Sequence, residues 1–257
     1  MKKIKFIILL LLSGIIASCH YEDDSKYGAY SDLIPGKQGV PHKHDKKFDK
    51  VYGHGIDLSH HNAEPDWNKL DIDFVIMKAT EGTDYIDPTF IPRLVKCKEN
   101  NIPVGAYHFF TGRKDGEKEF NNFYRIAADF IDIIPVVDAE KIPKGVTKKD
   151  YLGNLRVFLD RTKEVYGMFP IIYTSEEFYY STLKHMLDTH YSMNESINPV
   201  LPNKIWFGNI GVPYNKYSIC PVMNQISIKP VKGIEGKVDF NELHVPIEEI
   251  LLSYSSL

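Results

Sequence analysis

Short apolar runs alternate with amphipathic stretches through most of this 257-residue chain, and this alternation constrains the fold more than any other feature. Runs of apolar and β-branched residues bounded by turn residues predict strands. We expect strands at residues 54–59, 74–80, 103–110, 133–140, 170–174, 204–209, 222–227 and 237–241. Helical spacing of apolar residues predicts helices at 88–100, 115–128, 146–167 and 175–187, the third ending at Gly167 and the fourth capped by Ser175.

This order predicts one α/β domain over residues 51–257. Alternating strand and helix units imply a parallel sheet, and eight strands suggest a small barrel. The later strands lack full helices between them. We therefore expect an irregular TIM-like barrel, (β/α)5 followed by three further β-strands. An apolar content of 43% is enough for one sizeable core.

Residues 1–18 have the pattern of a lipoprotein signal peptide. Lysines near the N-terminus precede an apolar run that is too short to span a bilayer, which is typical of a secretory signal. The following Ile16-Ala17-Ser18-Cys19 resembles the bacterial lipobox, in which the cysteine becomes lipidated. A plain signal peptide with a chance cysteine is the alternative. Acyl chains on Cys19 would hold the protein in the membrane of the bacterial cell envelope, at the outer membrane or the cell surface.

Residues 19–50 are rich in charge and poor in large apolar side chains, which predicts a disordered tether behind the anchor. His42 and His44 could bind a metal there, although a solvated linker is the simpler interpretation. The formal charge of −3 gives no basic balance for nucleic acid. We expect a monomer. Three cysteines are too few for a disulfide framework, and Cys97 and Cys220 are compatible with one disulfide or with two buried thiols.

Four carboxylates fall at the ends of predicted strands: Asp57, Asp138, Glu140 and Asp239. In a β/α barrel the active site lies at the C-terminal ends of the strands. Because strand side chains alternate, Asp138 and Glu140 share one face. Two adjacent acids repel when both are ionised, so one pKa should rise and leave a proton donor beside an anion. Glycosidic cleavage needs such a pair, although a metal site or ordinary surface acids also fit this short motif.

A wider set of motifs follows in a fixed order. They are Gly55-Ile56-Asp57-Leu58-Ser59-His60-His61-Asn62 with Asp66-Trp67, Phe74-Val75-Ile76-Met77-Lys78-Ala79-Thr80-Glu81-Gly82, Asp87-Pro88-Thr89-Phe90, Gly105-Ala106-Tyr107-His108-Phe109-Phe110, Val137-Asp138-Ala139-Glu140, Pro170-Ile171-Ile172-Tyr173-Thr174 and Gly236-Lys237-Val238-Asp239-Phe240-Asn241. In this order they resemble glycoside hydrolase family 25, the Chalaropsis-type lysozymes. The resemblance covers nearly the whole predicted domain.

The resemblance implies an irregular barrel that hydrolyses the β-1,4 bond between N-acetylmuramic acid and N-acetylglucosamine in peptidoglycan. The glycan strand of peptidoglycan would be the partner of the site. Carried over by position, Glu140 would be the general acid and Asp138 its anionic partner. Asp57 and Asp239 would complete the acidic cluster. No metal and no organic cofactor is implied.

Several other residues are candidates for substrate binding. Tyr107 and Tyr173 could stack on sugar rings, because an aromatic face covers the apolar face of a pyranose. The further candidates are His108, Gln225 and Lys78. We place Trp206 in the core or the wall. We expect His60 and His61 to orient loops, although acid–base or ligand roles would also fit them.

The chain departs from the family pattern in two strands. Met223-Asn224 precede Gln225 where the family often has a tryptophan. Gly208-Asn209 end the sixth-strand motif, where family members more often carry Ala and a larger polar or aromatic residue at the end. The long insertion at 184–202 is expected to be a loop. These differences leave open a barrel that binds glycan with weak or no activity, and a hydrolase of another amino-sugar glycan.

Overall fold

The computed structural model describes residues 50–191, 204–208, 210, 211 and 221–252. The chain divides into two units, Met1–Gly39 and Val40–Leu257, and all described residues belong to the second. The predicted signal peptide, Cys19 and nearly all of the predicted tether, with His42 and His44, therefore lie outside the described residues. Within the described part, no helix has the length and apolar character needed to cross a membrane.

Strands and helices alternate through the described residues. The strands are β1 Gly53–Leu58, β2 Phe74–Glu81, β3 Tyr85–Ile86, β4 Val104–Phe109, β5 Val136–Asp138, β6 Ile171–Thr174, β7 Ile205–Phe207, β8 Met223–Lys229 and β9 Val238–Leu243. The helices are α1 Phe90–Glu99, α2 Gly116–Ala127, α3 Lys148–Tyr166, α4 Glu176–Phe178 and α5 Lys184–Tyr191, with 3-10 turns at Trp67–Lys69 and Ile247–Glu249.

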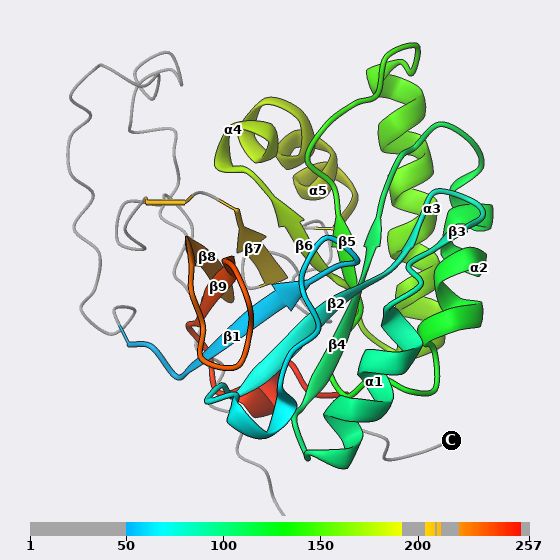
Figure 1. Cartoon of the computed structure of the whole chain (residues 1–257). Coiled ribbons are helices and arrows are strands. Elements are labelled where there is room, and N and C mark those ends of the chain that lie inside the picture. Colours follow the sequence, from blue (N-terminus) through cyan, green and yellow to red (C-terminus); the bar gives the residue numbers. More distant parts are fainter. Residues whose placement is uncertain (1–49, 192–203, 209, 212–220, 253–257) are drawn as a thin grey trace, which may run out of the picture. The chain divides into compact units, whose positions relative to one another are not determined.

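Among these strands, eight close into a barrel (Figure 1). The order around the ring is β1-β9-β8-β7-β6-β5-β4-β2, and β2 pairs with β1 to close it. Neighbours run parallel from β1 through β2, β4, β5, β6 and β7 to β8. Only β9 runs antiparallel to both of its neighbours in the ring. The predicted irregular barrel is confirmed.

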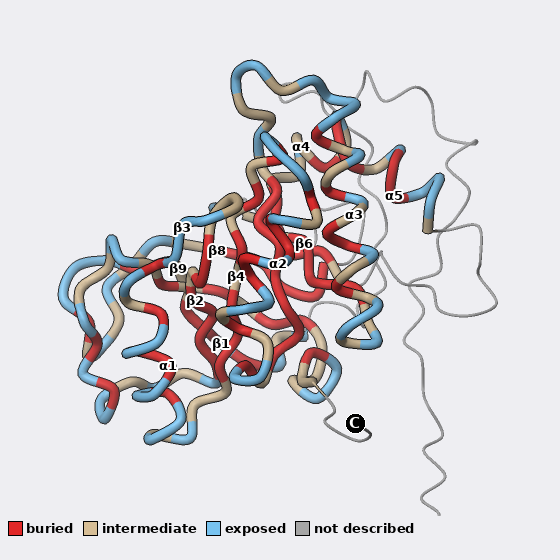
Figure 2. Tube along the Cα trace, turned by 90° about the vertical axis from the view of Figure 1, so that its right-hand side faces the viewer, coloured by how far each residue is buried: buried red, intermediate tan, exposed pale blue. Residues whose placement is uncertain are grey.

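Two apolar layers hold the barrel together, because strand side chains alternate between its inside and its outside. The inner cluster fills the lumen and includes Phe74, Ile76, Val136, Ile171 and Trp206. The outer cluster packs the strands against the helices and includes Ile56, Val75, Ala106, Val137 and Ile172. In Figure 2 the strands are buried along most of their length, while exposed residues lie on loops and outer helix faces.

Capping residues explain where α2 and α3 start and where α3 ends. The Asp115 carboxylate accepts a hydrogen bond from the Glu117 N–H at 2.9 Å, which starts α2. The Thr147 hydroxyl accepts one from the Asp150 N–H at 3.1 Å, which starts α3. The predicted end at Gly167 is confirmed, because this glycine adopts the left-handed conformation with φ of 73°.

The structure differs from the sequence prediction after β6. Ser175 caps a helix as expected and accepts the Phe178 N–H at 3.1 Å. A π-helical turn, Tyr179–Leu183, then separates α4 from α5, so the predicted helix 175–187 is divided. Helix α5 continues to Tyr191, where a loop was expected, and residues 192–203 lie outside the described part.

One predicted strand is shorter in the structure, and one short strand was not predicted. The strand expected at 133–140 is limited to β5, because Ile133 pairs with Leu251 and the Ile134 N–H donates to the Ile250 carbonyl. The two-residue strand β3 was not predicted, and it pairs antiparallel with the end of β2. Such a short strand is below the length at which alternation is recognisable.

Candidate active site

The four predicted carboxylates gather at one end of the barrel. Asp57 lies near the C-terminal end of β1, Asp138 is the last residue of β5, and Glu140 follows it by two positions. Asp239 is the second residue of β9. Because β9 runs antiparallel to β1, its beginning lies beside the end of β1. Asp239 therefore reaches this mouth from the start of its strand, not from a C-terminal strand end as the sequence suggested.

Asp57 and Asp239 are directly opposite each other in the β1–β9 pair. Opposed residues in an antiparallel pair project from the same face of the sheet. Burial, together with the Asp239 charge, raises the pKa of Asp57 to about 7 in spite of the hydrogen bonds it accepts. Burial also raises the pKa of Asp239. Asp57 is therefore partly protonated near neutral pH.

Two amide side chains hold one oxygen of Asp57. Its Oδ2 accepts hydrogen bonds from Gln225 Nε2 at 3.1 Å and from Asn241 Nδ2 at 2.8 Å. Each amide oxygen is held in turn by an aromatic side chain. The Tyr173 hydroxyl donates to Gln225 Oε1 at 3.0 Å, and Trp206 Nε1 donates to Asn241 Oδ1 at 3.0 Å. The floor of the site is thus a connected hydrogen-bond network.

Asp138 is the most enclosed of the four carboxylates. It is 8% exposed, and its Oδ1 is buried with no hydrogen-bond partner among the described residues. Burial, then the charges of Glu140 and Asp57, raise the pKa of Asp138 well above its usual value, and Lys78 and Lys141 oppose this only in part. The sequence analysis took Asp138 as the anion of the Asp138–Glu140 pair. In the structure the protonated form of Asp138 is favoured, because the side chain is almost fully buried.

Two tyrosines line the same space. Tyr107 and Tyr173 pack against the inner cluster from β4 and β6. Burial raises the pKa of both hydroxyls, and the carboxylates around them add to the effect. Tyr173 is in register with Asp138 and donates to Gln225, which binds Asp57, so this phenol lies among the carboxylates. Both hydroxyls therefore remain protonated throughout the neutral range and can donate hydrogen bonds.

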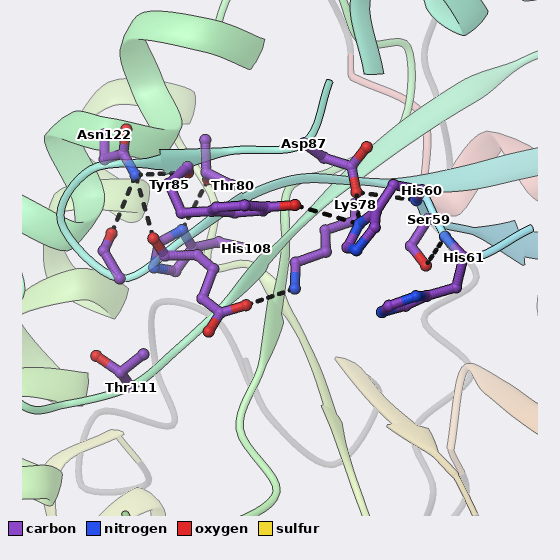
Figure 3. Close-up of polar contacts among 12 residues, drawn as sticks. Ser59, His60, His61, Lys78, Thr80, Tyr85, Asp87, His108, Thr111 and Asn122 are labelled. Carbon is purple, nitrogen blue, oxygen red and sulfur yellow. Dashed lines mark hydrogen bonds and ion pairs between the residues drawn. The ribbon is translucent and has the colours of Figure 1, made fainter. Parts of the chain in front are cut away.

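A bulge in β2 places Lys78 beside this cluster. The register between β2 and β4 shifts between Lys78 and Thr80, so Lys78 and Glu81 project from one face although they are three residues apart. Lys78 Nζ pairs with Glu81 Oε2 at 2.6 Å (Figure 3). The same ammonium lies 4.9 Å from the centre of the Phe109 ring, and Lys141 lies 5.1 Å from that ring. Two cations thus flank Phe109 near Asp138.

The family model described as "Glycosyl hydrolases family 25" matches residues 56–194. This chain belongs to glycosyl hydrolases family 25. The match starts at β1 and extends past α5, so it includes Asp57, Asp138 and Glu140.

Similar proteins agree with this family. The uncharacterized protein YegX of Escherichia coli K12 is 26% identical over 213 residues, which cover 77% of this chain and 71% of that protein. The autolytic lysozyme of Clostridium acetobutylicum is 26% identical over 192 residues, covering 73% of this chain and 55% of that protein.

Solved structures show the same fold. The bacterial lysozyme from Streptomyces coelicolor superposes with a TM-score of 0.63 at 23% identity, covering 79% of this chain and 96% of that chain. The modular autolysin LytC from Streptococcus pneumoniae, solved in complex with a synthetic peptidoglycan ligand, gives 0.57 at 16% identity, covering 74% of this chain and 46% of that chain.

Within this family 25 barrel, most predicted site residues lie together. The residues around the mouth and lumen are Asp57, Asp138, Glu140, Asp239, Tyr107, Tyr173, Gln225 and Lys78. Trp206 lies in the inner wall, as expected, at 2% exposure. His60 takes part in loop positioning, because its backbone N–H and its Nδ1 both contact Asp87 Oδ2, at 3.0 Å and 2.8 Å.

His108 does not belong to this group. It follows Tyr107 on β4, so its side chain projects outward between the barrel and the helices, where it is fully buried. Its Nδ1 lies 2.8 Å from Thr80 Oγ1 (Figure 3), its Nε2 lies 3.1 Å from Glu119 Oε2, and its ring stacks on Phe158. The expectation that His108 binds substrate is therefore corrected. Because successive side chains on a strand point to opposite faces, the adjacent positions of Tyr107 and His108 already indicated that only one of them could face the lumen.

Sequence reasoning missed Asn241 and Lys141. Asn241 is two residues from Asp239 on β9, and that spacing places both side chains on one face of the strand. The quoted motif contained this signal. Lys141 follows Glu140 directly, and its proximity to Phe109 depends on loop geometry that no local pattern reveals.

Other chemistry-bearing features contain none of the four carboxylates. A cavity of about 630 Å³ lies between the loops after β4 and β5 and the start of α3, with Arg113, Lys114 and Lys149 in its lining. The described residues contain no group of three or more histidine, cysteine or acidic side chains that could hold a metal ion. Cys97 is a buried free thiol, and Cys220 lies outside the described part.

Proposed function

We propose that this chain hydrolyses the β-1,4 bond between N-acetylmuramic acid and N-acetylglucosamine in peptidoglycan. Its family, glycosyl hydrolases family 25, supports a hydrolase of glycosidic bonds. The observation that carries the proposal is the convergence of four carboxylates on Tyr173 at one end of the barrel. The autolytic lysozyme among its relatives and the peptidoglycan ligand in the LytC structure support the choice of substrate.

Glu140 is the proposed general acid. It is half-buried, and so it can meet a glycosidic oxygen, whereas Asp138 is almost enclosed. Burial and the charge of Glu140 raise the pKa of Asp138, so Asp138 holds a proton in the free protein. A sugar amide that donates a hydrogen bond to Asp138 favours the ionised form of that residue. In the proposed route, substrate binding thereby releases the proton of Asp138 to Glu140, which passes it to the leaving oxygen.

The proposed route uses the acetamido group of the cleaved sugar. Glu140 gives its proton to the leaving oxygen as the bond from that oxygen to C1 breaks. The acetamido carbonyl oxygen attacks C1 and forms a cyclic intermediate, while Asp138 and Asp239 hold the acetamide. Water then opens the ring and returns a proton to Glu140. Direct attack by Asp138 and activation of water by Asp138 are the competing routes.

The configuration of the first product separates these routes in part. Substrate assistance predicts retained β configuration and no covalent enzyme adduct. Proton NMR of the first-formed product should show the β anomer. An initial α anomer would exclude the route, and a trapped glycosyl ester on Asp138 would favour direct attack.

A turbidity assay on purified peptidoglycan tests the proposed activity. We expect clearing by the wild-type chain and loss of clearing in Glu140→Gln, whose side chain has nearly the same size but no proton to give. Chitin oligosaccharides serve as the second substrate. Clearing of neither substrate, with retained glycan binding, would support the inactive barrel. Cleavage of chitin alone would support another amino-sugar substrate.

The location of the protein is a separate proposal. We propose that Cys19 carries a lipid anchor and that the barrel acts at the bacterial cell envelope. The support is the sequence pattern of the first nineteen residues.

A further inference from the structure

Asp57 is held by two hydrogen-bond chains that start at aromatic side chains. One chain runs from the Tyr173 hydroxyl through Gln225, and the other runs from Trp206 Nε1 through Asn241. Both chains end on the same oxygen, Oδ2. Neither chain reaches Oδ1, and the carboxyl group has one further hydrogen bond, from the backbone of Asp57 itself. The two oxygens of one carboxyl group therefore have different environments.

The aromatic donors determine which way each amide points. The indole N–H can only donate, so Asn241 must turn its oxygen toward Trp206 and its NH₂ toward Asp57. Burial and the four carboxylates keep the Tyr173 hydroxyl protonated, because they raise its pKa. Gln225 therefore accepts from Tyr173 and donates to Asp57. An amide turned the other way would present an oxygen to the carboxylate and repel its charge.

Packing fixes the two aromatic side chains. Tyr173 and Trp206 are paired in register between β6 and β7, and their ring centres are 4.7 Å apart in an edge-to-face arrangement. Gly208 leaves room for the phenol, since a Cβ at that position would lie 2.3 Å from the Tyr173 hydroxyl oxygen. The missing side chain at Gly208 thus makes room for the first donor of one chain.

We propose that Tyr173 and Trp206 are positioning residues for Asp57. Acting through Gln225 and Asn241, they hold Oδ2 as a permanent acceptor and leave Oδ1 as the atom that takes the proton and meets the substrate. The role of Oδ1 toward the substrate rests on the proposed function. The positioning of Asp57 by Tyr173 and Trp206 concerns the protein alone and can be measured without any hydrolysis.

Other titratable groups around Asp57 must be counted in any test. They are Asp239 from β9, Lys78 from β2, Tyr107 from β4, Asp138 from β5 and Tyr173 from β6. Replacing Tyr173 by Phe or Trp206 by Phe changes no formal charge near neutral pH. A shift in the titration of Asp57 in these variants therefore reports the loss of an oriented donor.

Carbon-13 NMR of the side-chain carboxyl groups tests the proposal, with Asp57→Asn used to assign the signal. The wild-type signal should titrate near pH 7. We expect Tyr173→Phe and Trp206→Phe each to raise the pKa of Asp57 by about half a unit to one unit, because each weakens a hydrogen bond to the ionised form. Tyr173→Phe removes a single oxygen atom and gives the cleaner result if Trp206→Phe folds poorly.

Phe207→Leu is the matched control. Phe207 neighbours Trp206 on β7 but faces the outer cluster, so its loss costs packing without touching either chain. We expect lower stability and an unchanged Asp57 titration. Unchanged pKa values in both aromatic variants, or an equal shift in Phe207→Leu, would overturn the proposal. If the wild type hydrolyses peptidoglycan, its rate–pH profile should move with the NMR titration in the same variants. An inactive wild type would refute the proposed function and leave the titration result standing.

Discussion

Asp57 and Asp239 lie opposite each other across the β1–β9 pair, so the barrel places two carboxylates side by side at its mouth. Like charges directly opposite each other on two strands are destabilising. Amide donors hold one oxygen of Asp57, and the raised pKa of Asp57 favours its uncharged form, which reduces the repulsion. Electrostatic repulsion between the carboxylates at the mouth therefore lowers the stability of the fold.

The first prediction concerns stability and pH. The pKa of Asp57 rises from 3.8 to about 7 on folding, so the folded state binds the proton more tightly than the unfolded chain. This contribution to stability is complete below about pH 4 and is lost as the pH rises to about 7. We expect Asp57→Asn to be more stable than wild type at pH 8, by on the order of 4 kcal/mol, and to lose this advantage at pH 4. Thermal unfolding at both pH values checks this, and equal effects at both would contradict it.

Neighbouring residues on β4 provide the second prediction. His108 faces the helices, where it contacts Thr80 and Glu119, whereas Tyr107 faces the lumen. We expect His108→Leu to lower the free energy of unfolding by about 2–3 kcal/mol, because buried polar partners lose their hydrogen bonds. The KM for peptidoglycan should not change.

Tyr107→Leu is the matched comparison on the same strand. It should raise the KM, because it removes an aromatic surface and a donor from the mouth. Chemical unfolding and steady-state kinetics on both variants check the assignment. A raised KM in His108→Leu would restore this residue to the substrate site.

Local patterns predicted most of the fold and of the site, and the exceptions have a common cause. Asp57, Asp138 and Glu140 were placed correctly at strand ends, because alternation and turn residues are local signals. The direction of β9 depends on pairing with β1 and β8, which are far away in sequence, so the approach of Asp239 was not predictable. The bulge that brings Lys78 and Glu81 together also depends on a partner strand. The same holds for the Trp206–Asn241 contact, which joins residues 35 positions apart.

The third prediction tests the proposed anchor. Cys19→Ser removes the thiol that would be lipidated, so we expect unprocessed or soluble protein in place of a membrane-bound form. Detergent-free fractionation with immunoblotting separates the two outcomes. A variant that stays in the membrane fraction, with the mobility of the wild-type protein, would contradict the lipobox interpretation.

The identity of the bond that is cleaved decides whether this barrel is a muramidase. Purified peptidoglycan is digested, the newly formed reducing ends are reduced with borohydride, and the fragments are identified by mass spectrometry. We expect reduced N-acetylmuramic acid at the new ends. Its release should be about 10²–10⁴-fold slower in Glu140→Gln, because general acid catalysis supplies a factor of that size. Reduced N-acetylglucosamine at the new ends, or equal release by wild type and Glu140→Gln, would contradict it.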